Sequence, residues 1–465
     1  MRRIRVSEWA DSRLAVVGNK LTGSVLTLDE EEKHSMKIRK VLTAAVALAA
    51  VGAIALTGCS GGSGSGDDGG KQTLTLWQNS TTGDGKQFWT DAAAAFHKAN
   101  PDVTVKVTSI QNEDMDGKLQ TAVNSGDMPD IFMARGGSKL ADVVAAGKVK
   151  DLTSKIDPDI KKAIGDAALS AFTVDGKLYG VPTAVLPGGV FYSKDLFAQA
   201  GITATPKTMD DLEADIAKLK EAGIAPIALG AKDAWPAAHW YYFFAVRACG
   251  KDLITNLATK KDFKDGCWMT AANNLQKFAQ VQPFNEGFLT TSAQQGANSS
   301  AGLVANHKAA MELMGAWEPG VVASLTPDQK PLADLDWFPF PEVSGGKGDA
   351  GAMMGGLDGY SCSEKSPSSC EKFLNFVASK QWQEKYATAF QTIPANQDAK
   401  GAVDNPSLKP LMEAYGTAPY VALWLDTALG QNVGNALNTG VVEMLAGQGD
   451  PKTLLQKITD AAARG

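Results

Sequence analysis

The order of strand and helix patterns constrains the fold of this chain more than any other feature. Residues Thr73–Trp77 and Val103–Thr108 alternate apolar and polar side chains, and Phe88–Ala99 between them has helical periodicity. The order continues with a helix at 116–125, a buried strand at 130–134 and a helix at 140–146. Strands that are joined through helices pair in parallel. The sequence therefore predicts a layered α/β fold.

Later segments repeat this order. Short strands are predicted at Lys177–Pro182 and Val190–Tyr192, around a turn at Pro187-Gly188-Gly189. A helix at Met209–Ala222 is expected to begin with Thr208 as its N-cap. Further strands are expected at 224–229 and 309–314, and helices at 370–378, 381–389, 429–446 and 453–463. A body of roughly 390 residues exceeds what one hydrophobic core supports, so two lobes are expected.

The front of the chain has the pattern of an export signal. A basic segment begins at Met36, and the uncharged run Val41–Leu56 follows, which is shorter than the about 20 residues of a membrane span. The ending Leu56-Thr57-Gly58-Cys59 resembles a bacterial lipobox, in which cleavage precedes the cysteine and its thiol receives a diacylglyceryl group. Residues 36–58 are thus predicted to be a lipoprotein signal peptide, rather than a core helix or a single-span anchor.

The segments on either side of this signal carry two more expectations. The acidic cluster Asp29–Glu32 does not suit a signal, so residues 1–35 are expected to be a mis-assigned extension with Met36 as the true start, rather than a long leader. Residues 60–70 contain only Ser, Gly and Asp, so residues 59–72 are predicted to be a lipidated cysteine and a flexible tether. This places the body outside the cell, anchored by lipid to the outer face of the membrane.

The five cysteines agree with export. Lipidation of Cys59 leaves four, which are expected to form the disulfides Cys249–Cys267 and Cys362–Cys370, with four buried free thiols as the alternative. A metal site is not expected, because the chain has no Cys-x-x-Cys motif and few histidines.

Composition and missing motifs exclude several function classes. The chain holds 45 basic and 51 acidic residues, and its formal charge of -6 argues against nucleic-acid binding. It lacks a phosphate-binding loop, a Gly-x-Ser-x-Gly motif and a recognisable catalytic triad. No cofactor is expected, the protein is not expected to be an enzyme, and any ATPase or permease must be a separate protein.

Several short motifs, taken in order, resemble the extracellular solute-binding lipoproteins of carbohydrate ABC importers, the branch related to maltose-binding protein. They are Leu74-Thr75-Leu76-Trp77, the run from Phe96 to Val105, Gly126-Asp127-Met128-Pro129-Asp130-Ile131, Leu178-Tyr179-Gly180-Val181-Pro182, Phe191-Tyr192-Ser193-Lys194, Lys308-Ala309-Ala310-Met311, Gly315-Ala316-Trp317 and Leu445-Ala446-Gly447. The resemblance covers Cys59 to the end of the chain.

The resemblance implies a two-lobed clamp of the periplasmic-binding-protein type (type II). Lobe 1 would comprise residues 73–180 and 345–395, and lobe 2 residues 183–340 and 400–465. The crossings near Val181–Gly189 and Pro339–Gly346 contain Pro and Gly, which suits a hinge, although they could equally be ordinary turns.

A sugar site needs flat aromatic rings for the C–H faces of the sugar and paired polar groups for its hydroxyls. The segment 235–244 is aromatic and polar, so Trp235 or Trp240 could stack on a sugar ring or simply pack in the core. Trp317 occupies the place where the family presents an aromatic side chain to its ligand. Trp424 precedes Asp426 in an otherwise apolar run, where an unpaired carboxylate would be costly.

Candidate polar contacts follow the predicted strands, where open α/β sheets bind ligands. Asn79 follows the first strand, Asn112 and Glu113 the second, and Arg135 the third. Asp358 lies among glycines that allow a ligand to approach the backbone closely. Each of these residues could instead cap a helix or meet a structural partner.

These observations together predict a monomeric capture protein that closes on an oligosaccharide, a di- to tetrasaccharide such as a raffinose-like or xylo-oligosaccharide, and presents it to an ABC permease. A secreted glycoside hydrolase is one alternative, since such enzymes also use carboxylate pairs and Trp platforms. A binding lipoprotein for a peptide or a polyamine is another.

Overall fold

The computed structural model describes residues 71–464. The expectations for the extension at 1–35, the signal peptide at 36–58, Cys59 and the tether up to residue 70 lie outside the described residues. Within residues 71–464, no helix combines the length and the apolar character that a membrane span requires.

A ten-stranded mixed sheet organises the fold, in the order β2-β1-β3-β10-β6-β8-β7, with three short strands at its margins. Its strands are β1 (Gln72–Gln78), β2 (Val103–Ser109), β3 (Ile131–Arg135), β6 (Val181–Ser193), β7 (Ala225–Ile227), β8 (Ala309–Gly315), β9 (Leu335–Phe338), β10 (Met353–Cys362), β11 (Ile393–Pro394) and β12 (Val421–Leu423); β4 (Thr173–Val174) and β5 (Lys177–Leu178) form a separate pair. The predicted parallel pairing is confirmed for β1 with β2 and β3, and for β7 with β8. In contrast, β10 pairs antiparallel with β3 and β6, and β6 pairs antiparallel with β8, so the sheet is mixed.

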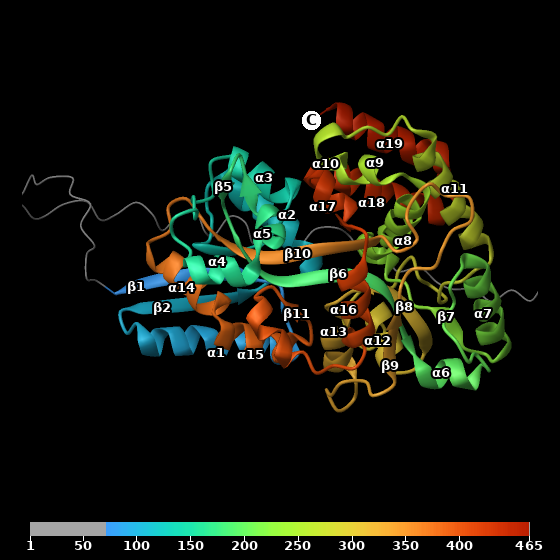
Figure 1. The fold of residues 1–465 in the computed structure, drawn as a ribbon, viewed down its shortest axis with the longest axis horizontal. Coiled ribbons are helices and arrows are strands. Elements are labelled where there is room, and N and C mark those ends of the chain that lie inside the picture. Colours follow the sequence, from blue (N-terminus) through green and yellow to red (C-terminus); the bar gives the residue numbers. More distant parts are fainter. Residues whose placement is uncertain (1–70, 465) are drawn as a thin grey trace, which may run out of the picture. The chain divides into compact units, whose positions relative to one another are not determined.

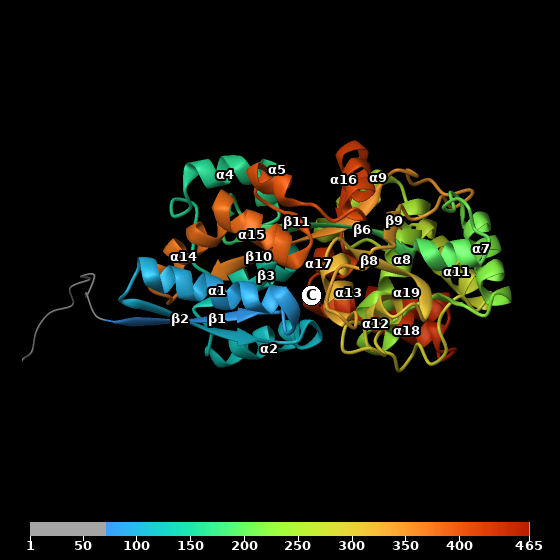
Figure 2. The ribbon, with the colours of Figure 1, turned by 90° about the horizontal axis from the view of Figure 1, so that it is seen from below.

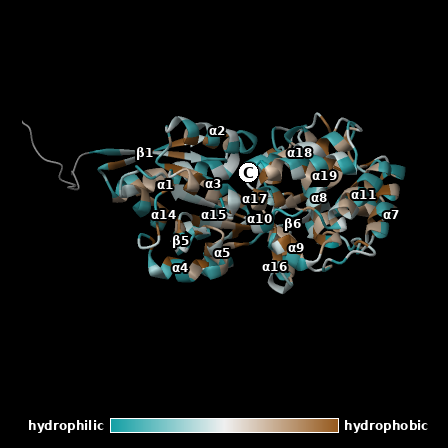
Figure 3. Cartoon of the chain, turned by 90° about the horizontal axis from the view of Figure 1, so that it is seen from above, coloured by the Kyte–Doolittle hydropathy of each residue, from teal (hydrophilic) through white to brown (hydrophobic). Residues whose placement is uncertain are grey.

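Helices pack around this sheet (Figures 1 and 2). The first half of the chain contributes α1 (Gly83–Ala99), α2 (Asn112–Ser125), α3 (Ser138–Ala145), α4 (Pro158–Ile164), α5 (Asp166–Ser170), α6 (Lys194–Gln199), α7 (Met209–Glu221), the 3-10 helix η1 (Ala231–Asp233) and α8 (Trp235–Ala248). The second half contributes α9 (Lys251–Thr255), α10 (Leu257–Lys260), α11 (Gly266–Gln280), α12 (Ser300–Ala305), α13 (Glu318–Leu325), α14 (Ser369–Ala378), α15 (Lys380–Phe390), the 3-10 helix η2 (Gln397–Ala402), α16 (Leu408–Thr417), α17 (Leu425–Leu429), α18 (Gln431–Leu445) and α19 (Pro451–Ala463). Polar and apolar residues mix along α1 and α19, as in helices that bury one face (Figure 3).

Two hydrophobic clusters form the interior. The first gathers around β1, β3 and α1, where Trp89 and Phe132 are fully buried. The second gathers around α8, α11 and α18, where Trp268 and Leu437 are fully buried. The strands β6 and β10 contribute residues to both clusters and therefore connect them.

The prediction of two short strands around a Pro-Gly-Gly turn is wrong. Residues 181–193 form one continuous strand, β6, whose first part pairs with β10 and whose second part pairs with β8 and β9. A Cβ atom at Gly188 would lie 2.4 Å from the Trp424 ring, and one at Gly189 would lie 2.4 Å from the Trp337 ring. The two glycines thus allow indole rings to lie directly against the strand, which is a second reason for glycine besides a turn.

The ends of the helices agree with the sequence pattern to within one residue, but several starts differ, because α1 begins five residues earlier than expected and α2 begins four residues earlier. Thr208 caps α7 as expected and forms a reciprocal capping box with Asp211. The helix expected at 429–446 begins only at Gln431, because Gly430 has a φ of 81° and separates α17 from α18.

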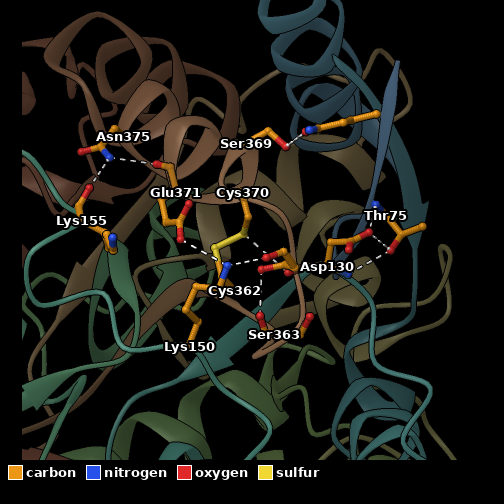
Figure 4. Close-up of a disulfide and its surroundings, with 12 residues drawn as sticks. Thr75, Asp130, Lys150, Lys155, Cys362, Ser363, Ser369, Cys370, Glu371 and Asn375 are labelled. Carbon is orange, nitrogen blue, oxygen red and sulfur yellow. Dashed lines mark hydrogen bonds and ion pairs between the residues drawn. A yellow bond between two sulfur atoms is a disulfide. The ribbon is translucent and has the colours of Figure 1, made fainter. Parts of the chain in front are cut away.

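Both predicted disulfides are present. Cys249 at the end of α8 joins Cys267 in α11, and Cys362 at the end of β10 joins Cys370 in α14. Figure 4 shows the second of these bonds beside the ion pair of Lys150 with Glu371, whose atoms are 3.3 Å apart.

Removing Cys249–Cys267 is expected to destabilise the protein more than removing Cys362–Cys370. The first bond joins cysteines 18 positions apart and the second joins cysteines 8 positions apart. A disulfide that closes a longer loop lowers the conformational entropy of the unfolded chain more, and so stabilises the folded state more. The Cys249→Ser/Cys267→Ser variant should lose about 3 kcal/mol of unfolding free energy in urea titrations. A larger loss for Cys362→Ser/Cys370→Ser would contradict this ranking.

Candidate ligand-binding site

The polar side chains that follow β1 and β3 lie close together in the structure. Because β1 and β3 are parallel neighbours, their carboxyl ends lie at the same edge of the sheet. The amide of Asn79 donates to Oδ1 of Asn112 at 3.2 Å, and Nη2 of Arg135 donates to the same oxygen at 2.9 Å. Asn112 opens α2, so β1, β3 and α2 each supply one member of this group.

Arg135 also belongs to a chain of ion pairs. Its Nε lies 3.1 Å from Asp116 Oδ1, and its Nη1 lies 3.7 Å from Asp358 Oδ1. Lys139 continues the chain, with Nζ 2.8 Å from Asp116 Oδ2 and 2.9 Å from Asp426 Oδ2. These side chains are 11% to 25% exposed, so the pairs are shielded from solvent much more than ordinary surface pairs.

The network sets the charge state of its carboxyl groups. Burial disfavours the charged forms of Asp116 and Asp426, but the cations outweigh it: Arg135 and then Lys139 lower the pKa of Asp116, and Lys139 lowers the pKa of Asp426. Burial outweighs Arg135 at Asp358 and raises the pKa of that carboxyl group. Three acids against two bases leave the network with a net negative charge when all are ionised.

Replacing Lys139 with methionine is expected to lower the unfolding free energy at pH 7 by about 3–5 kcal/mol, because the shielded carboxylate of Asp426 loses its cationic partner and that of Asp116 keeps only Arg135. The pKa values of Asp116 and Asp426 are depressed in the folded protein, so their contribution to stability is present above the unfolded pKa and is lost as the pH falls. The difference between wild type and variant should therefore shrink in acid.

A matched control is Lys194→Met. Lys194 pairs with Asp336 at 3.7 Å, but its side chain is 47% exposed, so the expected loss is below about 1 kcal/mol. Urea titrations at pH 7 and pH 4 measure both variants. Equal losses for the two lysines would show that the network adds nothing beyond a surface pair.

Four aromatic side chains form a second group, which we call the aromatic cluster: Trp235, His239, Trp317 and Trp424. The ring of Trp317 lies 6.0 Å from that of Trp235 and 5.9 Å from that of Trp424, measured between centroids. The cluster draws on α8, the end of β8 and the residue before α17. Asp426 adjoins His239 and so connects the cluster to the ion-pair network.

The polar atoms of the aromatic cluster are buried without partners. Within residues 71–464, no hydrogen bond is made by the indole Nε1 of Trp235, Trp317 or Trp424, or by Nδ1 of His239. A buried polar atom normally has a partner, so each exception calls for an explanation. Three donors and a ring nitrogen between flat apolar faces match the chemistry of a saccharide.

Glu113 follows Asn112 in the first turn of α2. Its Oε2 accepts from Gln295 at 3.3 Å, and its Oε1 is buried without a partner among the described residues. Burial, and then the nearby Asp233, raise the pKa of Glu113 despite hydrogen bonds that oppose the shift.

Of the two alternatives left open for Trp240, stacking on a sugar or packing in the core, the structure shows packing in the core. Every residue of α8 from Pro236 to Ala248 is buried. Trp240 is 1% exposed and stacks on Phe278, with ring centroids 5.0 Å apart. Trp235 and His239 are four residues apart and share the face of α8 that meets the cluster, whereas Trp240 packs in the second hydrophobic core.

Sequence reasoning missed Lys139 and His239 as site residues. Lys139 follows Arg135 by four positions but sits on a separate helix, and only its contact with Asp426 shows its role. The only feature of the sequence that could have indicated Lys139 is its position, because it is a cationic residue in the first turn of the helix that follows a predicted strand. His239 was one member of an aromatic run.

A hollow adjoins the ion-pair network and is lined by Asp116, Arg135 and Lys139 together with Gln431 of α18. A second hollow lies beside it, between α2, α3 and α18. Neither lining includes the aromatic cluster.

The family model for bacterial extracellular solute-binding proteins matches residues 79–384. The diacetylchitobiose binding protein DasA of Streptomyces coelicolor is 25% identical over 438 residues, covering 88% of this chain and 95% of the relative.

Two solved structures have the same fold. One, from work on xylan utilization by the thermophilic bacterium Caldanaerobius polysaccharolyticus, has a TM-score of 0.78 at 24% identity and covers 83% of this chain and 99% of its own. A chitin oligosaccharide binding protein has a TM-score of 0.74 at 25% identity and covers 84% and 98%. These similarities confirm the predicted two-lobed α/β fold.

Proposed function

Since the chain belongs to the family of bacterial extracellular solute-binding proteins, we propose that its solute is an oligosaccharide, which it captures between its lobes and delivers to a separate ABC permease. The single observation that carries the proposal is the aromatic cluster with its unpartnered buried nitrogen atoms. The ligands named for the diacetylchitobiose binding protein DasA and the chitin oligosaccharide binding protein belong to the same class and support the proposal.

The chemistry of the site fits a neutral sugar. The indole faces of Trp235, Trp317 and Trp424 offer flat apolar area for the C–H faces of sugar rings. The polar group of Asn79, Asn112 and Arg135 supplies donors and acceptors for hydroxyls. The site thus combines stacking with directed hydrogen bonds, which suits capture and needs no bond-breaking step.

The remaining parts of the proposal concern how the protein works in its setting. A lipid on Cys59 and a tether up to residue 72 would hold a monomer at the outer face of the membrane. Lobe 1 would comprise 73–180 with 345–395, and lobe 2 183–340 with 400–465, with crossings near Val181–Gly189 and Pro339–Gly346. Ligand binding would shift the population of open and closed forms by its difference in affinity for the two.

Calorimetry of the purified protein with diacetylchitobiose, xylotriose, raffinose and a dipeptide tests the proposal. We expect one saccharide to bind without being cleaved and to raise the melting temperature, since a ligand at 100 times its Kd adds about 2.7 kcal/mol. Binding of the dipeptide alone, or of none of these probes, would contradict the proposal. Cleavage products in the incubated mixture would favour a glycoside hydrolase instead.

A further inference from the structure

We propose that His239 is a specificity-determining residue that accepts a hydrogen bond at Nδ1 from a hydroxyl group of the bound saccharide. The proposal rests on the function proposed above and deepens it, because it states that the saccharide must have a hydroxyl group at the position that faces His239. It differs from ring stacking, which recognises the faces of a sugar and not its hydroxyls.

The imidazole of His239 is held in one orientation. Its ring lies parallel to that of Trp424, with centroids 4.2 Å apart and an interplanar angle of 12°. Trp235 flanks it at 5.1 Å and Tyr242 at 5.6 Å, and the residue is only 4% exposed. A ring enclosed in this way cannot turn freely to find another partner, so Nδ1 keeps its direction.

The state of the ring makes Nδ1 an acceptor. Nδ1 of His239 has no hydrogen-bond partner within residues 71–464, and the proposal places the single proton of the neutral ring on Nε2. Burial lowers the pKa of His239 to about 4, although the nearby Asp426 opposes this, so the ring is neutral at pH 7. A neutral ring with a proton on Nε2 carries a lone pair on Nδ1.

The surrounding groups indicate what donates to this lone pair. The other unpartnered atoms of the aromatic cluster are the indole N–H groups of Trp235, Trp317 and Trp424, which are all donors. A hydroxyl group can donate to Nδ1 and accept from an indole N–H at the same time. A ligand with an ether oxygen or a hydrogen in its place would leave Nδ1 buried and unpaired, and such sites reject analogues that lack the matching group.

Two variants separate the acceptor from the flat ring. His239→Phe keeps a ring that can stack on Trp424 but has no hydrogen-bond acceptor. His239→Gln keeps an acceptor, the side-chain amide oxygen, but has no ring. With the saccharide of the panel that binds wild type most tightly, we expect His239→Phe to lose affinity by at least about tenfold and His239→Gln to lose less. His97→Phe, a change on an exposed part of α1, should bind as wild type does.

Nitrogen NMR of the wild-type protein with labelled histidine tests whether Nδ1 is the acceptor. This measurement needs no variant, so a variant that fails to fold cannot affect it. Nδ1 of His239 should carry no proton in the free protein, and its resonance should move in the direction of hydrogen bonding when the saccharide is added. A proton on Nδ1, an unmoved resonance at saturation, or equal affinity of His239→Phe and wild type would overturn this inference and leave the proposed function standing. Failure of every saccharide to bind wild type would instead overturn the proposed function, and this inference with it.

Discussion

Replacing Trp317 with alanine is expected to lower the affinity for the saccharide by at least about a hundredfold, because Trp317 occupies the centre of the aromatic cluster. Its ring contacts those of Trp235, His239 and Trp424, and it packs against both hydrophobic cores. A central aromatic side chain in a shielded pocket is the kind of residue that carries most of a binding free energy. Calorimetry with the best saccharide measures the loss.

Two further variants show whether the loss comes from the ring. Trp317→Phe keeps a flat apolar face and should retain more affinity than the alanine variant. Trp77→Ala is the matched control, because Trp77 is also half-buried but its ring lies under the ammonium of Lys118, 4.8 Å away, and not in the cluster. Equal losses for Trp317→Ala and Trp77→Ala would mean that general destabilisation explains both.

Replacing Glu312 and Glu318 together with glutamine is expected to raise the stability of the protein at alkaline pH by an amount on the order of a few kcal/mol. Both side chains are almost fully buried, Glu312 on β8 and Glu318 at the start of α13. Burial raises the pKa of Glu312 to about 8, and burial together with the neighbouring Glu312 raises the pKa of Glu318 well above its ordinary value.

The direction of the pH dependence follows from these shifts. The folded state binds these protons more tightly than the unfolded state, so the stabilisation is complete below the unfolded pKa, near 4.5. It is lost as the pH rises through the folded pKa, about 8 for Glu312. Wild type should therefore lose stability between pH 5 and pH 8.5, and the double glutamine variant should lose less.

Urea titrations at pH 5 and pH 8.5 measure the effect. Glu443→Gln serves as the control, because Glu443 is 37% exposed and pairs with Lys457 on the surface, so its replacement should leave the pH dependence unchanged. The same loss of stability with pH in wild type and in the double glutamine variant would show that the two carboxyl groups are ionised in the folded protein at neutral pH.

Local features of the fold were predictable from the sequence because they depend on neighbours along the chain. The alternation at β1 and β2, the helical spacing of α1 and the Thr208 cap each follow from a few adjacent residues. The site was predictable in part for a related reason. Parallel strands bring their carboxyl ends to one edge, so Asn79, Asn112 and Arg135 meet.

At two places the prediction from the sequence was wrong or left open, because the residue type found there can serve two structural purposes. Glycines in β6 were interpreted as a turn, whereas they make room for the rings of Trp337 and Trp424. In α8, the sequence left open whether Trp240 stacks on a sugar or packs in the core, and the structure shows the second. In both places the partner that decides the outcome lies far away in the chain, so no local pattern reveals it.

The sequence by itself determined the α/β order, the two disulfide pairs and the kind of side chains that a sugar site needs. Only the tertiary structure decided that Lys139 joins Asp426 across a separation of 287 residues, and that His239 stacks on Trp424 with Nδ1 unpaired. The physical reason is that secondary structure depends on contacts between residues a few positions apart. The charge state of a side chain, and whether its polar atoms find a hydrogen-bond partner, depend instead on which residues from distant parts of the chain surround it and shield it from water.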